Sequence, residues 1–400
     1  MYVLKLEICK GASLDFTSYN ESDEFTNVSF DYPSLEIVEE PIQIALVTVF
    51  SVTAFFSLAS NICVIIVLTV STRTSRELKA FLINLAVSDV LMAIFSIPFT
   101  YTMFLLGRWI FAPWFCPVVL TMQHVSVFVS VYTLAAIAID RYKAITNPLG
   151  NRMTASRNKL VIASIWVFSF FLSSVQLVVS RARPFRYDNQ IYYDCTEDWD
   201  TPQEGQVYTV FIFCVSFFLP LLSLGFTYLI IGLKLWRRHV PGNANSVRDT
   251  IAVRAKWKII KMLLTIVLLF ALCWLPLQLF ILAFYFYPEL AKYDTDRRRN
   301  LYAISYFACL WLANANSFVN PLIYSFMSEN FRHDLKEVLS RSIGLCDGDH
   351  SKFRRDYSMR STHTKIYYKH SQSCTRYSHN RATTATTTME LYELPPAKHV

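Results

Sequence analysis

The chain contains seven long stretches of apolar residues, and this feature limits its fold more than any other. The stretches are Ile44–Val70, Ala80–Leu106, Pro117–Ile139, Leu160–Val179, Val207–Leu235, Ile259–Tyr287 and Tyr302–Met327. Each reaches or exceeds the roughly 20 residues that a helix needs to cross about 30 Å of hydrocarbon. A soluble core helix that is apolar on every side is uncommon, and seven in one chain are not expected. The sequence therefore predicts an all-α membrane protein with a bundle of seven transmembrane helices.

Basic residues concentrate in three loops between these stretches. They follow the first and third stretches and separate the fifth from the sixth, and they are Arg73, Arg76, Lys79, Arg141, Lys143, Arg152, Arg157, Lys159, Lys234, Arg237, Arg238, Arg248, Arg254, Lys256 and Lys258. By the positive-inside rule these loops are cytoplasmic, so the acidic amino terminus lies outside the cell. Arg297-Arg298-Arg299 falls on the expected outer face and disagrees, but three inner loops outweigh it. The net charge of +8 is thus a property of the cytoplasmic face, and nucleic acid is not an expected partner.

The segments outside the bundle have distinct compositions. Residues 1–41 form an acidic outer tail with glycosylation sequons at Asn20 and Asn27, and the bundle is expected over 42–328. No secretory signal peptide is evident, so the first span is expected to direct insertion. Residues 329–342 are amphipathic and predict a short helix on the inner membrane surface. Residues 343–400 are polar and predict a disordered cytoplasmic tail, in which Cys346 is either palmitoylated or a free thiol.

Three motifs give the bundle a more specific identity. Asp140-Arg141-Tyr142 ends the third stretch, Cys273-Trp274-Leu275-Pro276 lies in the sixth, and Asn320-Pro321-Leu322-Ile323-Tyr324 lies in the seventh. A charged pair beside a membrane span is costly, which indicates that it has a function. With these motifs, residues 42–342 resemble a rhodopsin-like (class A) G-protein-coupled receptor. The resemblance implies a plasma-membrane protein whose partners are membrane lipid, a heterotrimeric G protein, arrestin and receptor kinases. For the kinases, the tail offers the threonines of residues 383–388, although a plain solubilising tail is the alternative.

The resemblance also implies a disulfide. Of nine cysteines, only Cys116 and Cys195 lie at expected outer ends or loops, where an oxidising compartment permits a bridge. In the family such a bridge holds the second outer loop over the third helix.

By the same resemblance, the residues at the inner end form a switch. Asp140 pairs with Arg141 at rest, and Arg141 is released to the G protein when the helices part. Tyr228 and Tyr324 match the tyrosines that close over this arginine in active family members. The acid that locks the arginine in some relatives is replaced by Lys256. Interior prolines kink helices and provide pivots, and the candidates are Pro220, Pro276 and Pro321, with Phe270 and Trp274 before the second.

A set of polar residues falls near the middle of the spans. Polar groups at this depth need partners inside the bundle, so we expect one buried cluster around Asp89. In the family, matching residues bind a sodium ion that favours the inactive state; a network without an ion is the alternative. The candidate residues are Asn61, Asp89, Ser130, Asn316, Ser317 and Asn320, and no other cofactor is expected.

Other classes of membrane protein fit less well. The chain has no HExxH, GxGxxG or P-loop motif for an enzyme, no similar halves for a transporter, and no filter sequence for a channel. Amine receptors carry an aspartate where this chain has Gln123, and opsins need a lysine that Tyr302–Met327 lacks. The resemblance instead implies a peptide receptor, and the alternative is a receptor of the same fold with a non-peptide ligand or none.

Several residues indicate the kind of peptide. Gln123 is found in receptors for neuropeptide Y, neuropeptide FF, orexin and RFamide peptides, and Thr100 lies in a run similar to that of neuropeptide Y receptors. Side-chain amides at Gln123, Gln176 and Gln278 can bind a C-terminal carboxamide, which offers both a donor and an acceptor. Glu197 and Asp198, in a stretch similar to neuropeptide FF and RFamide receptors, can pair with a ligand arginine unless they are simply solvated. Trp274 completes the predicted ligand contacts.

Overall fold

The computed structural model describes residues 38–146, 155–236, 246–291 and 296–342. The sequons at Asn20 and Asn27, the palmitoylation candidate Cys346 and the tail from residue 343 lie outside these ranges. The chain divides into two units, Met1–Asp334 and Leu335–Val400. The bundle belongs to the first unit, and the described part of the second is the remainder of the last helix.

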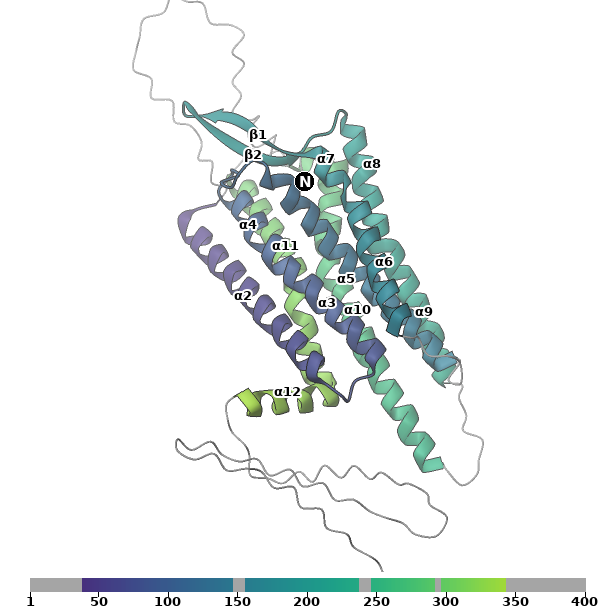
Figure 1. Cartoon of the computed structure of the whole chain (residues 1–400). Coiled ribbons are helices and arrows are strands. Elements are labelled where there is room, and N and C mark those ends of the chain that lie inside the picture. Colours follow the sequence, from purple (N-terminus) through teal and green to yellow (C-terminus); the bar gives the residue numbers. More distant parts are fainter. Residues whose placement is uncertain (1–37, 147–154, 237–245, 292–295, 343–400) are drawn as a thin grey trace, which may run out of the picture. The chain divides into compact units, whose positions relative to one another are not determined.

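The seven predicted stretches are helical, and the helices lie side by side in a bundle (Figure 1). The first, third, sixth and seventh spans are the single helices α2 (Glu40–Val70), α5 (Phe115–Thr146), α10 (Ser246–Phe286) and α11 (Asp296–Met327). The second, fourth and fifth spans are interrupted. They consist of α3 (Arg76–Phe95) with α4 (Ile97–Leu105), α6 (Ala155–Ser173) with α7 (Val175–Val179), and α8 (Pro202–Phe213) with η1 (Cys214–Phe218) and α9 (Leu219–Trp236).

Within the described ranges, six spans are long and apolar enough to cross a membrane by length and composition. The helix that does not qualify is α11, although its 32 residues correspond to about 48 Å at 1.5 Å per residue. It is less apolar because Asn314, Asn316 and Asn320 lie in its second half and charged residues lie in its first turn. These asparagines are buried, so the polar groups face the other helices, as a polar residue in a membrane helix requires.

The interruptions have local causes. Ser96 separates α3 from α4 with φ −98° and ψ −62°, two residues before Pro98 in the first turn of α4. The π-helical turn η1 precedes Pro220 in the second position of α9. A proline cannot donate a backbone hydrogen bond, and wider turns accommodate this loss. In contrast, Pro276 and Pro321 lie inside continuous helices, so the predicted pivots differ in form between the spans.

A β-hairpin, which the all-α prediction did not include, joins α7 to α8. Strands β1 (Ser180–Tyr187) and β2 (Gln190–Glu197) pair in antiparallel register, with Tyr187 opposite Gln190. The two-residue turn between them has positive φ at both positions, 47° at Asp188 and 57° at Asn189. Aspartate and asparagine tolerate this left-handed conformation, which suits a type I′ hairpin turn. We call the end of the bundle that carries β1 and β2 the hairpin end, and the opposite end of α5 the Arg141 end.

The predicted disulfide is present and links the hairpin to the bundle. Cys195 in β2 is bonded to Cys116 at the beginning of α5, with 5.6 Å between the two Cα atoms. A backbone hydrogen bond of 2.7 Å from Trp109 to the carbonyl of Tyr193 adds a second attachment. The position of β2 is therefore set by the loop before α5 as well as by α5 itself.

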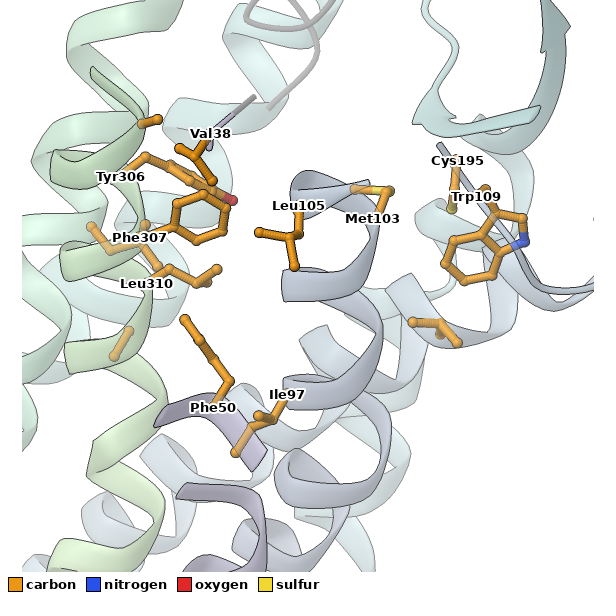
Figure 2. Packing of buried hydrophobic residues seen from close by; sticks show 14 of the residues in the cluster. Val38, Phe50, Ile97, Met103, Leu105, Trp109, Cys195, Tyr306, Phe307 and Leu310 are labelled. Carbon is orange, nitrogen blue, oxygen red and sulfur yellow. The ribbon is translucent and has the colours of Figure 1, made fainter. Parts of the chain in front are cut away.

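Apolar packing fills the hairpin end beside α2, α4 and α11. Figure 2 shows Phe50 between Ile97 on one side and the side chains of Phe307 and Leu310 on the other. The Phe50 ring is fully buried and stacks on Tyr101 with ring centroids 5.2 Å apart. Deeper in the bundle, Asn84 joins three spans, because it donates to Thr133 at 2.7 Å and accepts from Trp166 at 2.9 Å.

The predicted amphipathic segment is the helix α12 (Glu329–Ser342). Its first residues belong to the first unit and are attached to the bundle. Phe331 packs against Tyr324 with ring centroids 6.0 Å apart. Arg73, from the loop between α2 and α3, forms an ion pair with the buried carboxylate of Asp334.

Candidate functional site

A cavity of about 170 Å³ lies inside the hairpin end. One water molecule needs only roughly 10–15 Å³ of this measure, so the cavity has room for a ligand group. Its lining comes from α3, α4, α5, β2, α8, η1, α10 and α11. The polar residues among them are Ser96, Thr100, Gln123, His124, Glu197, Tyr208, Thr209, Ser216, Gln278, Tyr306 and Asn314.

Gln123 on α5 is held in one orientation. Its Nε2 donates to the hydroxyl of Thr100 at 2.6 Å and, more weakly, to the backbone carbonyl of Phe95 at 3.4 Å. Because a carbonyl can only accept, the nitrogen must be the atom that faces Phe95. The other amide atom, Oε1, has no hydrogen-bond partner among the described residues. Gln123 therefore presents a hydrogen-bond acceptor to the cavity.

Glu197, the last residue of β2, places a carboxylate at the same cavity. Its Oε1 accepts from Nε2 of Gln176 at 2.9 Å, and its Oε2 accepts from the indole of Trp199 at 3.0 Å. Both donors are neutral, so neither supplies a positive charge to the carboxylate. Each oxygen also keeps a lone pair. The site can thus bind a cation, and an arginine fork can contact both oxygens.

Two of the predicted ligand contacts, Gln176 and Asp198, are not among the residues that line the cavity. Gln176 on α7 is fully buried and is occupied by Glu197, by the hydroxyl of Tyr208 at 3.2 Å and by Ser180 at 2.5 Å. It orients the carboxylate instead of facing a ligand. Asp198 forms an ion pair with Arg183 of β1, and its side chain is not part of the lining.

The cavity also contains residues that the sequence analysis missed. His124 adjoins Gln123 and donates from Nδ1 to the carbonyl of Leu120 at 2.8 Å, which leaves Nε2 as an acceptor in the neutral ring. Tyr208 and Asn314 add a hydroxyl and an amide to the lining. His124 could have been predicted from the sequence, because it is a polar residue directly after Gln123 on the same helix. Asn314 could have been predicted from its position two helical turns before Pro321.

Trp274 connects the cavity to the middle of the bundle. Its ring lines the cavity, and its buried indole nitrogen has no partner among the described residues. The Phe270 ring follows at a centroid distance of 6.1 Å, and Phe217 lies 6.3 Å from Phe270. The three rings therefore connect the cavity to the π-helical turn that holds Phe217.

The predicted buried cluster surrounds Asp89. Its carboxylate is 2% exposed and accepts from Nδ2 of Asn320 at 2.9 Å. No lysine, arginine or histidine of the described residues forms an ion pair with it. The nearby pairs are Ser88 with Ser130 at 2.8 Å and Asn61 with the carbonyl of Ser317 at 2.8 Å. A buried carboxylate among hydroxyl and amide oxygens is a donor set that suits a hard cation such as sodium.

At the Arg141 end, Arg141 is paired with its neighbour. Its Nε donates to the Asp140 carboxylate at 3.0 Å, and a second guanidinium nitrogen contacts the same oxygen. Tyr228 on α9 is buried and lies within electrostatic range of this arginine. Tyr324 is also buried, and its hydroxyl has no partner among the described residues. The arrangement is the paired state of the arginine, with Tyr228 nearby.

The same end holds an ion pair between α10 and α12. Lys258 contacts Glu329, and this hydrogen bond lowers the pKa of the Glu329 carboxyl from its ordinary value. Lys256, the residue predicted to replace an acidic lock, has no partner among the described residues. The contact across this end therefore runs from the sixth span to the beginning of α12.

Comparison with known proteins gives consistent matches over most of the chain. The family model described as 7 transmembrane receptor (rhodopsin family) matches residues 60–324. A substance-P receptor from Aquarana catesbeiana is 32% identical over 304 residues, which are 76% of this chain and 72% of that receptor. An RYamide receptor from Drosophila melanogaster is 32% identical over 348 residues, which are 84% of this chain and 72% of that receptor. The human neuromedin-K receptor is 30% identical over 290 residues, which are 72% of this chain and 60% of that receptor.

The geometry around Glu197 depends on Gly205 in α8. A Cβ atom at this position would lie 3.0 Å from Cδ1 of Trp199 and 3.0 Å from the hydroxyl of Tyr285. Gly205→Ala is therefore expected to displace both rings and to destabilise the fold by about 1–3 kcal/mol. The midpoint of thermal unfolding of the purified protein should fall by several degrees.

The matched control for this substitution is Gly225→Ala, because nothing lies within 4 Å of a Cβ atom at Gly225. Its melting temperature should stay unchanged or rise slightly, since alanine favours a helix. Equal melting temperatures for the two variants would contradict the proposed packing.

Proposed function

The chain belongs to the rhodopsin family of seven-transmembrane, G-protein-coupled receptors, and from this premise we propose that it is a neuropeptide receptor. As a member of this family it is a multi-pass membrane protein and not an enzyme. The proposal is supported by the relatives, whose names give substance P, neuromedin K and RYamide as ligands. The observation that carries it is the cavity in which Gln123 and Glu197 offer an acceptor and a carboxylate.

We propose further that the peptide is amidated at its C-terminus. The free Oε1 of Gln123 can accept a hydrogen bond from the NH₂ group of a carboxamide. A free peptide carboxylate has no hydrogen to donate, so two acceptors would face each other, and a buried unpaired acceptor is costly. Among the relatives, the Drosophila receptor is named for an amidated peptide.

A cationic residue near the amidated end is the second part of the proposal. The Glu197 carboxylate is held by two neutral donors, so a ligand arginine would supply the missing positive charge. The sequence analysis favoured RFamide and neuropeptide Y-like peptides, whereas the relatives include receptors named for other peptides. An arginine followed by an aromatic amide is the ligand end that the cavity fits best.

The proposed signal passes from the cavity to the Arg141 end. A peptide that contacts Trp274 and Gln278 would shift α10 through Pro276, and this movement would separate α10 from α5. Arg141 would then leave Asp140 for the G protein, with Tyr228 and Tyr324 closing beside it. The peptide acts by population shift, because it binds the state with separated helices more tightly. Arrestin and receptor kinases stay predicted partners of the cytoplasmic tail.

We propose that the hairpin end faces the cell exterior and the Arg141 end the cytoplasm of the plasma membrane. The Cys116–Cys195 bond supports this orientation, since disulfides persist in oxidising compartments. The basic loops beside Arg73 and Lys159 support it independently.

The proposed function is tested with amidated peptides on cells that express the full chain, with calcium and cyclic AMP readouts. Peptides ending in arginine and an aromatic amide should activate the receptor. Glu197→Gln should lower their potency about 10- to 100-fold, because a charge-assisted hydrogen bond is lost. A peptide in which citrulline replaces the arginine should activate the parent receptor and the Glu197→Gln variant with similar potency. No response to any amidated peptide would refute the ligand, and equal losses for both peptides would refute the role of Glu197.

A second test concerns Gln123. We expect Gln123→Ala to reduce the ratio of amide to free-acid potency about three- to tenfold, because the acceptor for the carboxamide is lost. Surface expression, measured with an antibody to an added epitope, should be unchanged. Thr69→Ala is a control, since the Thr69 hydroxyl bonds only within its own helix. An unchanged ratio in Gln123→Ala would mean that the carboxamide binds elsewhere.

A third test concerns the sodium ion that we propose for the Asp89 cluster. In membranes of the parent receptor, sodium chloride should weaken agonist binding relative to the same concentration of N-methylglucamine chloride. Asp89→Asn should abolish this difference, because it removes the carboxylate that neutralises the cation. A sodium effect of equal size in the variant would exclude Asp89 as the ion's ligand.

A further inference from the structure

A second hollow lies at the Arg141 end, between α9 and α10. It has about 770 Å³ of room and is lined by Leu235, Trp236, Arg254, Trp257, Lys258 and Lys261. This volume is within the range of about 300–1,000 Å³ that ligand sites occupy. Figure 1 shows α10 continuing beyond the end of α9 here, so one wall extends farther than the other.

The exposed faces of both helices lead into this hollow. On α9 the exposed apolar residues recur every three or four positions and end at Trp236, which is 83% exposed; they are Leu219, Leu222, Phe226, Leu229 and Leu233. On α10 the exposed residues Leu264, Leu268, Leu272, Leu275 and Leu279 form a similar face. Counting back three, three and four residues from Leu264 gives Lys261, Lys258 and Arg254. In a seven-helix membrane protein, such exposed apolar faces contact lipid.

The hollow therefore lies where a lipid-facing surface becomes polar. Tryptophan is enriched at the interface between hydrocarbon and water, and Trp236 and Trp257 fit that level. The three cations on α10 extend over about 10 Å of helix at 1.5 Å per residue, which is more than one phosphate group spans. The only acidic contact that they have among the described residues is the ion pair of Lys258 with Glu329. Both of its side chains are exposed, 46% and 70%, so the pair is weak and easily exchanged.

We propose that this hollow binds the headgroup of a phospholipid that carries more than one phosphate, such as a phosphoinositide. Arg254 and Lys261 bind separate phosphates, and Lys258 exchanges the Glu329 carboxylate for the lipid. The acyl chains lie along the exposed apolar faces of α9 and α10. The inference rests on the proposed orientation, which places the Arg141 end in the leaflet that carries anionic lipids. Bound lipid would release α10 from the beginning of α12 and so change the resistance to helix separation.

A G-protein surface is the other partner that such cations can serve, and the position of the hollow argues against it. The buried face of α10, with Leu263, Ile266 and Phe270, points toward the other helices, so the cations lie on the outward face. Arg141, which marks the G-protein end of the switch, does not line the hollow.

The experiment uses the purified full chain in phosphatidylcholine nanodiscs, without peptide or G protein. Phosphatidylinositol 4,5-bisphosphate is titrated, and bound lipid is counted by native mass spectrometry. Phosphatidylserine at the same total charge is the reference lipid. The double variant Arg254→Gln, Lys261→Gln should bind the phosphoinositide at least about tenfold more weakly, because each basic residue near an anionic surface contributes appreciably.

The matched control is Lys143→Gln, Lys159→Gln, which removes the same charge from exposed residues of α5 and α6 at the same end. It should bind the phosphoinositide as the parent does, and thermal unfolding verifies that all variants are folded. Equal losses in both double variants, or no preference over phosphatidylserine, would overturn the proposal. So would phosphoinositide binding by Arg254→Gln, Lys261→Gln that equals binding by the parent protein. Because no peptide is used, these outcomes are independent of the peptide proposal.

Discussion

The bond between Cys116 and Cys195 determines where the polar groups of the hairpin end can lie. It attaches β2 to the beginning of α5, and successive residues of a strand point to opposite sides. Glu197 follows Cys195 by two residues, so it shares the side that faces the bundle, while Asp198 points away to Arg183. Gln123 lies two turns along α5 from the same bond. One covalent link therefore brings a carboxylate and an amide from distant segments to a single cavity.

The remaining constraint is the membrane, which requires that buried polar groups have partners within the chain. Asn84 meets this requirement by bonding two other spans, and Gln176 does so by bonding Glu197. Several buried side-chain atoms have no hydrogen-bond partner among the described residues, and they include the indole nitrogen of Trp274 and the hydroxyl of Tyr324. Both belong to the pathway proposed to change on activation. An unpaired group is costly, so any rearrangement that gives these two groups partners gains stability from them.

Apolar length predicted the seven spans, because it depends on local sequence, and the family resemblance predicted the disulfide. Five of the predicted ligand contacts line the cavity, and they are Thr100, Gln123, Glu197, Trp274 and Gln278. The hairpin was missed because β1 and β2 contain charged and aromatic residues without an apolar alternation. Without a strand, nothing distinguished Glu197 from Asp198, although a period of two would have separated them. Gln176 was predicted at the cavity from its depth in the fourth span, whereas that helix is interrupted at Ser174 and Gln176 bonds to Glu197 of β2.

The interrupted spans and the continuous spans have different proposed roles at the two ends of the bundle. The helices that break, at Ser96 and in the turn Cys214–Phe218, shape the cavity wall without requiring movement of their lower halves. The helices that continue through Pro276 and Pro321 transmit displacement over their whole length. Resistance to that displacement then depends on contacts at the Arg141 end. The ion pair of Lys258 with Glu329 is the contact there that joins α10 to α12. Because it is exposed, ions or lipids at the membrane surface can weaken it without entering the bundle.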